Sequence, residues 1–501
     1  MIFVSPVLLT GCLVGPNFQP PPSPATHRYT DERLPEHTVA TPSLGKAGIV
    51  QHFKPGRDIP HEWWGLFQSK SLDQLVRLSL KNSPNLAAAK AALAQARENL
   101  LSQIGTTLFP SVDLQGFGQR QRFSDDTIGF NQGSIFNLFN VQANVSYTLD
   151  LFGGARRAVE AYGAQVDYQQ YQLIGAYLAL TANVVTTAIT VASFKAQIAA
   201  TLDLLRAQEV TLNILTKQFD LGGISRTQVY TQETLVNQTR ASLPSLQKRL
   251  AQSKHALAAL VGVLPSCKLP ELELSELTLP ANLPVVLPSR LVRMRPDIQA
   301  SEALLHAASA QIGVATANLL PQVTLSGYYG WTAMTASGLF DPANHVWSVM
   351  SSFLQPVFRG GALQAQRRAA IDACQQAFQQ YRQTVLQAFQ NVADSLQAIE
   401  TDGRILKAQR TAEIAARNSL TLAQSQYRLG GASYIVLLNA QQQYQQTRIT
   451  RIQAQTNRYN DTAGLLQALG GGWWNYPRTA CQSQRCIVKR TNVKTRGGAY
   501  G

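Results

Sequence analysis

The second half of the chain repeats the landmarks of the first, and this duplication constrains the fold more than any other feature. Each half contains a proline-led helical segment, a proline followed by alternating residues, a turn with two glycines, and a long helical segment interrupted by Leu-Gly-Gly. An offset of roughly 206 to 212 residues is far longer than a solenoid period of about 20 to 50 residues. The sequence therefore predicts a duplicated unit of two strands and several helices. The landmarks Pro84, Pro110, Phe152, Gly153, Gly154, Leu221, Gly222, Gly223 and Gly262 correspond to Pro296, Pro321, Phe358, Gly360, Gly361, Leu429, Gly430, Gly431 and Gly470.

The composition argues against several functional classes. Charged residues make up 15% of the chain, and no segment approaches the about 20 unbroken apolar residues of a membrane-spanning helix. The formal net charge of +15 would suit nucleic-acid binding, but the basic residues are scattered along helical segments and no nucleic-acid motif is present. The seven histidines are dispersed, and there is neither a nucleophile elbow nor a phosphate loop. We expect no enzyme, no cofactor, no metal site and no nucleic-acid partner.

Cys12 is the one cysteine whose context indicates a role. It ends the short apolar run Leu8–Cys12, which closes with small residues and resembles the cleavage site of a bacterial lipoprotein. The cysteine of such a site is lipidated and becomes the new N-terminus. The alternative is an ordinary signal-peptide end, and the positive charge typical of a secretory signal is absent before Cys12. Leu13, in place of an acidic residue, favours delivery to the outer membrane.

The rest of the chain divides by composition and periodicity. The N-terminal arm is rich in Pro, His and Thr and shows no sustained periodicity. The pair Trp63 and Trp64 then opens a helical segment and is most simply a core contact. We expect a signal segment at 1–12, an extended arm at 13–60, a first repeat at 61–265, a linker at 266–289, a second repeat at 290–472 and a basic, disordered tail at 473–501.

Four segments alternate between apolar and polar side chains, two in each repeat. Their length of about ten residues is what a tilted strand needs to cross a bilayer. The polar partners are mostly uncharged, which suits a wet lumen. A half-buried soluble sheet produces the same alternation, so the pattern leaves both interpretations open. The segments lie at about 112–123, 141–150, 322–331 and 346–358, within strand-bearing stretches of about 111–152 and 322–358.

Two long helical hairpins follow the glycine pairs. Residues 362–429 contain no proline and would form a helix of about 100 Å. The Leu-Gly-Gly breaks at 221–223 and 429–431 supply the positive φ that a helix end and a tight turn require. The helices are rich in glutamine, which indicates a helical wall with solvent on both sides. Four strands cannot close a barrel in lipid, where small barrels start at about eight strands. Several copies must therefore share one barrel if these strands span a membrane.

Ordered motifs give the chain its family resemblance. It resembles the outer-membrane factors of tripartite efflux pumps, in particular the TolC/OprM-like lipoproteins of the NodT family, over residues 12 to about 472. The motifs are Cys12–Pro21, Tyr147–Gly154, Arg295–Glu302, Gln355–Gly361 and Tyr427–Ser433, followed by Leu437–Gln441.

The resemblance implies a fold that is mainly α with β. It implies a homotrimer with a twelve-stranded outer-membrane β-barrel, continued by a long periplasmic α-helical barrel. The expected function is a passive exit duct for drugs and other toxic small molecules, coupled to an inner-membrane RND transporter through a periplasmic adaptor. Two alternatives remain. One is a channel for type I protein secretion with an ABC transporter. The other is a lipid-anchored periplasmic coiled-coil scaffold, which would require sustained heptads.

The resemblance also places a periplasmic gate just after the second Leu-Gly-Gly. Relatives commonly carry two acids there, in a pattern like Val-Asp-Val-Leu-Asp-Ala, whereas this chain has Val436 and Asn439 at the two positions. Gln228 stands where some members carry an acid in the first half, and Tyr427 matches a tyrosine that tethers the closed mouth. We expect weaker cation selectivity than in relatives with an acidic ring; the alternative is that Asn439 is only a helix-surface residue.

The two glycine turns are expected to meet the hairpin tips of the adaptor, because exposed backbone at a glycine lets another helix end approach closely. The alternative is that the glycines serve turn geometry alone. The residues concerned are Leu221, Gly222, Gly223, Ser225, Leu429, Gly430, Gly431 and Ser433.

Overall fold

The computed structural model describes residues 13–26, 28–32, 35–122 and 135–475. Cys12 and most of the basic tail lie outside these residues. The described chain forms two compact units, and each draws on both halves of the sequence. Unit 1 combines residues 13–22 with the described parts of Lys90–Tyr171 and Ala300–Thr384, and unit 2 combines the described parts of Ser23–Ala89, Gln172–Gln299 and 385–475.

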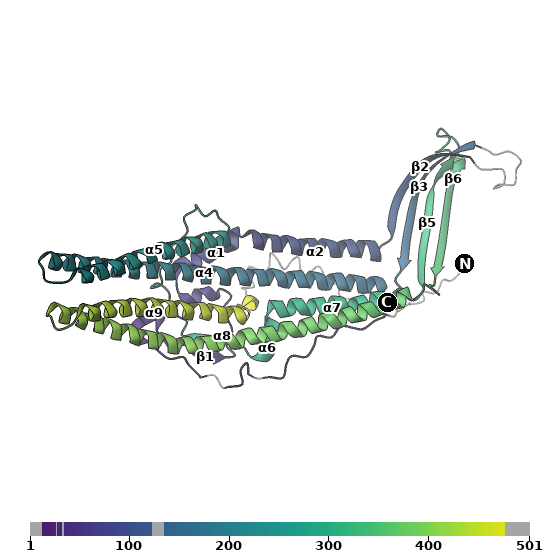
Figure 1. The fold of residues 1–501 in the computed structure, drawn as a ribbon. Coiled ribbons are helices and arrows are strands. Elements are labelled where there is room, and N and C mark those ends of the chain that lie inside the picture. Colours follow the sequence, from purple (N-terminus) through teal and green to yellow (C-terminus); the bar gives the residue numbers. More distant parts are fainter. Residues whose placement is uncertain (1–12, 27, 33–34, 123–134, 476–501) are drawn as a thin grey trace. The chain divides into compact units, whose positions relative to one another are not determined.

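Unit 1 contains a four-stranded antiparallel sheet (Figure 1). Its order is β2-β3-β5-β6, so the strand pairs of the two repeats meet where β3 pairs with β5. Three strands lie where the alternation predicts them, and β3 begins earlier, in the aromatic-rich run that precedes position 141. The strands are β2 (Ser111–Arg122), β3 (Ile135–Leu149), β5 (Gln322–Ala333) and β6 (His345–Leu354).

The helices follow the proline and glycine signals of the sequence. α2 (Pro84–Leu108) and α7 (Pro296–Ala317) each begin at a proline, whose missing N–H has no intrahelical partner at this position anyway. α4 (Gly154–Asp220) and α8 (Ala362–Arg428) are 67 residues each. The return helices are α5 (Arg226–Val261), of 36 residues, and α9 (Tyr434–Ala468), of 35 residues. The expected long hairpins are therefore confirmed.

Unit 2 is built around an apolar core. Trp63 and Trp64, in the 3-10 turn η2 (Trp63–Phe67), are fully buried beside Tyr459 of α9. α1 (Lys70–Asn82) packs Leu72, Leu75 and Val76 into the same core. α4 includes an 18-residue stretch with a mean hydropathy of 1.6, apolar enough to span a membrane, but half of that stretch is buried inside the protein. Its apolar residues join this core, so packing accounts for their hydrophobicity.

A short parallel pair of strands occurs where the sequence indicated only an arm and a linker. β1 (His52–Pro55) pairs with β4 (Asn282–Val285). This pair was not among the strands expected from the sequence. The two segments are separated by more than two hundred residues, so local periodicity carries no sign of the pairing. The arm also contains the 3-10 helix η1 (Pro42–Ala47). Helix α6 (Pro288–Met294) begins at the end of the linker.

The arm is fastened to α9 by a buried polar network in unit 2. Arg458 is fully buried; its Nη2 donates to Thr38 Oγ1 at 3.0 Å and its Nε donates to Gln51 Oε1 at 3.2 Å. Asp402 of α8 is also buried. Burial raises its pKa to about 7, the hydrogen bond to Asp461 and that residue's charge act in the same direction, and Arg458 opposes them.

The first described residues of the chain dock in unit 1. The buried guanidinium of Arg157 donates to the carbonyl of Val14 at 3.1 Å and to Asn17 Oδ1 at 2.7 Å. Phe18 stacks on His306 with the ring centroids 4.4 Å apart. A segment with no secondary structure of its own is thus held by specific side-chain contacts.

Candidate functional site

One face of the sheet in unit 1 carries a ladder of uncharged amides. Asn140 Nδ2 donates to Gln142 Oε1 at 3.1 Å, and Gln142 Nε2 donates to Asn144 Oδ1 at 2.8 Å. The ladder continues onto β2, where Gln115 Oε1 accepts from Asn144 Nδ2 at 3.3 Å. Directly paired residues share a face of an antiparallel sheet, so these contacts define one polar face. Asp113, which pairs with Asn144, is the one carboxylate that the described strands place on this face. The face is otherwise uncharged and can line a wet channel.

The opposite face of the sheet is mainly apolar, with Arg120 and Arg122 standing on it at the end of β2. Directly paired positions form rows across the four strands, for example Val112, Val145 and Val349 around a glycine of β5. Many of these side chains are exposed, including those on the outer strands β2 and β6. Exposed apolar patches of this kind mark surfaces that contact a partner or a membrane.

The two glycine turns of unit 2 have nearly identical geometry. Gly222 and Gly430 adopt φ of +76° and +77°, a region that residues with a side chain rarely enter. In each turn the second glycine donates its N–H to a glutamine carbonyl at 2.8 Å. Leu221 and Leu429 are each 87% exposed. The turns therefore present backbone and a leucine to solvent.

Two tyrosines link the hairpin α4–α5 to the hairpin α8–α9 near these turns. Tyr427 donates its hydroxyl to Gln218 Oε1 at 3.4 Å, and Tyr434 donates to Gln232 Oε1. The two tyrosine rings meet edge to face with centroids 6.1 Å apart. Gln232 Nε2 in turn donates to the carbonyl of Gln208 at 3.0 Å. Burial raises the pKa of both tyrosines, so both hydroxyls remain neutral donors.

The other expected gate residues take part in no such link. Asn439 and Val436 are exposed on α9. Gln228 is half-buried, and its Oε1 lacks a hydrogen-bond partner within the described part of the chain. Arg226, at the start of α5, lies over the rings of Phe219 and Tyr230 at 5.7 and 5.4 Å. The structure thus brings Tyr427 into a cross-hairpin contact and leaves Asn439 to solvent.

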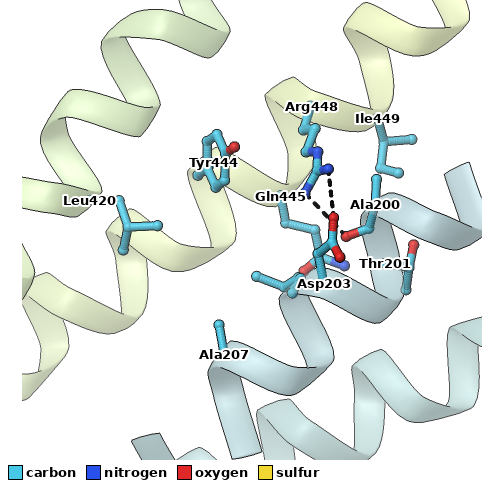
Figure 2. A pocket seen from close by; sticks show the side chains of 10 residues that line it. Ala200, Thr201, Asp203, Ala207, Leu420, Tyr444, Gln445, Arg448 and Ile449 are labelled. Carbon is cyan, nitrogen blue, oxygen red and sulfur yellow. Dashed lines mark hydrogen bonds and ion pairs between the residues drawn. The ribbon is translucent and has the colours of Figure 1, made fainter. Parts of the chain in front are cut away.

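A cavity of about 210 Å³ lies between α4, α8 and α9 in unit 2 (Figure 2). Figure 2 shows Arg448 of α9 and Asp203 of α4 pointing toward one another, and their Nη2–Oδ2 distance is 2.9 Å. The hydrogen bond from Arg448 is the main cause that lowers the pKa of Asp203. This ion pair bridges the two hairpins beside a mainly apolar lining. The lining residues are Ala200, Thr201, Asp203, Leu204, Ala207, Leu420, Tyr444, Gln445, Arg448 and Ile449.

The comparison with known families decides the identity of this architecture. The model of the outer membrane efflux protein family matches residues 75–263 and 287–471, one match in each half. The chain belongs to this family. It is 29% identical to the toluene efflux pump outer membrane protein TtgC of Pseudomonas putida, over 97% of each chain. It is 27% identical to nodulation protein T of Rhizobium leguminosarum, over 98% of this chain and 96% of that one.

A solved structure extends the family assignment to the fold. The outer-membrane channel OprN superposes with a TM-score of 0.82 at 26% identity, over 92% of this chain and all of that one. The TolC-like fold with duplicated repeats is confirmed. This outer membrane efflux protein is the outer-membrane exit duct of a tripartite efflux pump. Its relatives are efflux channels, which argues against a coiled-coil scaffold.

Sequence reasoning missed Tyr434 and the glutamine partners of both tyrosines. Gln218, Gln232 and Tyr434 make the cross-hairpin hydrogen bonds. Glutamine is so frequent in these helices that composition singles out none of them. Only the pairing of hairpins from different repeats shows which amides are buried and bonded.

Proposed function

We propose that three copies of this chain complete one β-barrel and work as a passive duct with no catalysis of their own. The observation that carries the proposal is the open sheet of four strands, in which β2 and β6 are the outer strands. Their backbone groups find no strand partner among the described residues, and lipid cannot satisfy them. Pairing of β2 with β6 of a neighbouring copy would supply those bonds, and three copies give about twelve strands, a number within the range of membrane barrels.

The cargo is proposed to be small amphiphilic or apolar molecules that an inner-membrane RND transporter delivers through a periplasmic adaptor. One relative is named for toluene efflux. The uncharged amide ladder Asn140–Gln142–Asn144–Gln115 supports this assignment, because amides hold neither anions nor cations and Asp113 is the one carboxylate that the described strands place on the same face. A neutral solute would pass this face without being held by charged groups.

The adaptor is proposed to meet the glycine turns, and the gate is proposed to lie beside them. The exposure of Leu221 and Leu429 supports the first assignment, since a coiled-coil tip could bury both leucines. The neutral side chain of Asn439 supports a gate with low cation selectivity. Lipidation at Cys12 and the six-part division of the chain remain part of the proposal.

Cross-linking between copies tests the shared barrel. In a chain whose Cys267, Cys374, Cys481 and Cys486 are replaced by serine, with Cys12 left for lipidation, Leu114→Cys on β2 combined with Val349→Cys on β6 should give covalent dimers and trimers with a short thiol cross-linker. The matched control is Leu114→Cys with Ala143→Cys, two paired positions within one sheet, which should cross-link only within a chain. The purified protein should also show discrete conductance steps in a planar bilayer. Monomers alone and no conductance would refute the proposal.

A further inference from the structure

Among the described residues, no group of three or more His, Cys, Asp or Glu could hold a metal ion. The fold nevertheless brings one pair of histidines together. His37 of the arm and His52 of β1 form an isolated antiparallel bridge, with ring centroids 5.6 Å apart. Both side chains are exposed. Their separation of fifteen positions in the sequence is no metal-ligand spacing, so only strand pairing reveals the pair.

The backbone around the pair brings the two imidazoles close to each other. Thr38 N donates to Gln51 O at 2.9 Å, and Phe53 N donates to Glu36 O at 3.0 Å. These bonds flank His37 and His52, which makes the histidines a non-hydrogen-bonded pair. Cα atoms in such a pair are only about 4.5 Å apart, and the side chains leave the same face of the ladder.

The opposite face of the same strand pair is held in place by buried hydrogen bonds. Side chains alternate along an extended segment, so Thr38 and Gln51 point away from the face that carries the histidines. Both are buried and bonded to Arg458 of α9. The histidines are therefore displayed on a backbone held from behind by a buried network. A preorganised pair loses little conformational entropy when it chelates an ion.

We propose that His37 and His52 form a two-histidine site for a first-row divalent cation of the Zn²⁺, Ni²⁺ and Cu²⁺ class, with solvent completing the coordination. Imidazole nitrogens favour these ions over Mg²⁺ or Ca²⁺. At a Zn–N distance of about 2.0–2.1 Å, each ring centre lies about 3 Å from the ion, so two rings at a tetrahedral angle have centroids about 5 Å apart. The observed 5.6 Å requires only a small adjustment of the rings.

The neighbouring groups set the strength and the effect of binding. Lys54 lies two residues along β1, on the same face, and its charge opposes a cation. Asn282 of β4 pairs with His52 and adds a neutral oxygen close by. With two strong ligands and one opposing charge, we expect moderate affinity. The bound ion would link His37 to β1, on the face of this strand pair opposite to Thr38, Gln51 and Arg458.

Zinc binding to the full chain tests the site, with protein purified in detergent without a polyhistidine tag. Titration calorimetry should show one Zn²⁺ per chain, and His37→Ala and His52→Ala should each weaken binding at least tenfold. His255→Ala, an exposed histidine on α5, is the matched control and should bind as the wild type does. Thermal unfolding without zinc establishes that the variants are folded.

Copper provides a second readout that does not depend on affinity. The electron paramagnetic resonance spectrum of the Cu²⁺-loaded chain should show two nitrogen ligands in the wild type and one in each single variant. Absence of binding to the wild type would overturn the proposal, as would zinc binding or a copper spectrum that either alanine variant leaves unchanged. Neither outcome bears on channel formation, which the cross-linking experiment measures separately.

Discussion

The hydroxyl of Tyr434 is the contact between the two hairpins whose removal should alter the duct most. Tyr434 is 5% exposed and its acceptor Gln232 is fully buried. The change Tyr434→Phe keeps the ring but leaves Gln232 Oε1 buried without this donor. An unsatisfied buried acceptor costs about 1–3 kcal/mol. That cost applies only while the hairpins stay in the observed arrangement, because separation of the hairpins lets water reach the amide.

This cost converts into a change in the population of the separated state. A bias of about 1–3 kcal/mol shifts a two-state equilibrium by roughly 5- to 150-fold. The contact of Tyr427 with Gln218 is weaker, since it is 3.4 Å long and only partly buried. Tyr427→Phe should therefore shift the equilibrium about twofold, for roughly 0.5 kcal/mol. The structure thus predicts that loss of the Tyr434 hydroxyl shifts the equilibrium more than loss of the Tyr427 hydroxyl does.

Single-channel recording in a planar bilayer measures the fraction of time that the duct conducts. Tyr434→Phe should raise that fraction strongly and Tyr427→Phe slightly, with trimers intact on gels. Tyr230→Phe is the matched control, because Tyr230 is exposed on α5. If Tyr434→Phe behaves like this control, or if Tyr427→Phe has the larger effect, then the buried bond does not hold the gate and the reasoning is wrong.

Three further outcomes follow from the same residues. Asn439→Asp should introduce cation selectivity and block by divalent ions in bilayer recordings. If the reversal potential does not change, Asn439 is only a residue of the helix surface and does not lie at a constriction. Gly222→Leu and Gly430→Leu should lower efflux in a susceptibility assay while trimers persist, and Gly430→Ala, which has the same φ strain but little bulk, should do less harm if bulk at an adaptor contact is the cause. Between about pH 4 and pH 7 the raised pKa of Asp402 should make the free energy of unfolding fall, because the folded state holds the proton to higher pH than the unfolded state does. Asp402→Asn should therefore flatten the fall in melting temperature from pH 5 to pH 8, and Asp372→Asn, at an exposed position of the same helix, should not.

Local chemistry made the helical hairpins predictable from the sequence. Proline starts α2 and α7, and the Leu-Gly-Gly turns end α4 and α8, so the signals lie within a few residues of the feature. The alternation of apolar and polar residues predicted the strands of the four-stranded sheet equally well. β1 and β4 were missed because each is four residues long and its partner is remote in sequence.

The candidate gate was only partly predictable for a related reason. Tyr427 was found by resemblance, but its partner Gln218 and the stronger pair Tyr434 and Gln232 depend on how α4–α5 lies against α8–α9. No local pattern distinguishes a buried glutamine from the many exposed ones in the same helices. The histidine pair at 37 and 52 has the same origin, since strand pairing alone brings the two rings together.

The chemistry of the links between the hairpins changes along their length. Near the turns the bonds join neutral groups, Tyr427 to Gln218 and Tyr434 to Gln232. Farther along α4 the links to α9 include the ion pair of Asp203 with Arg448 beside the cavity and, beyond it, the neutral bond of Thr456 to Ser193. Salt screens exposed charges and leaves neutral hydrogen bonds nearly unchanged, and a partly exposed ion pair contributes at most about 1 kcal/mol. Raising the ionic strength should therefore loosen the seam beside the cavity without opening the turns. We propose that opening comes instead from a partner that docks on the exposed Leu221 and Leu429.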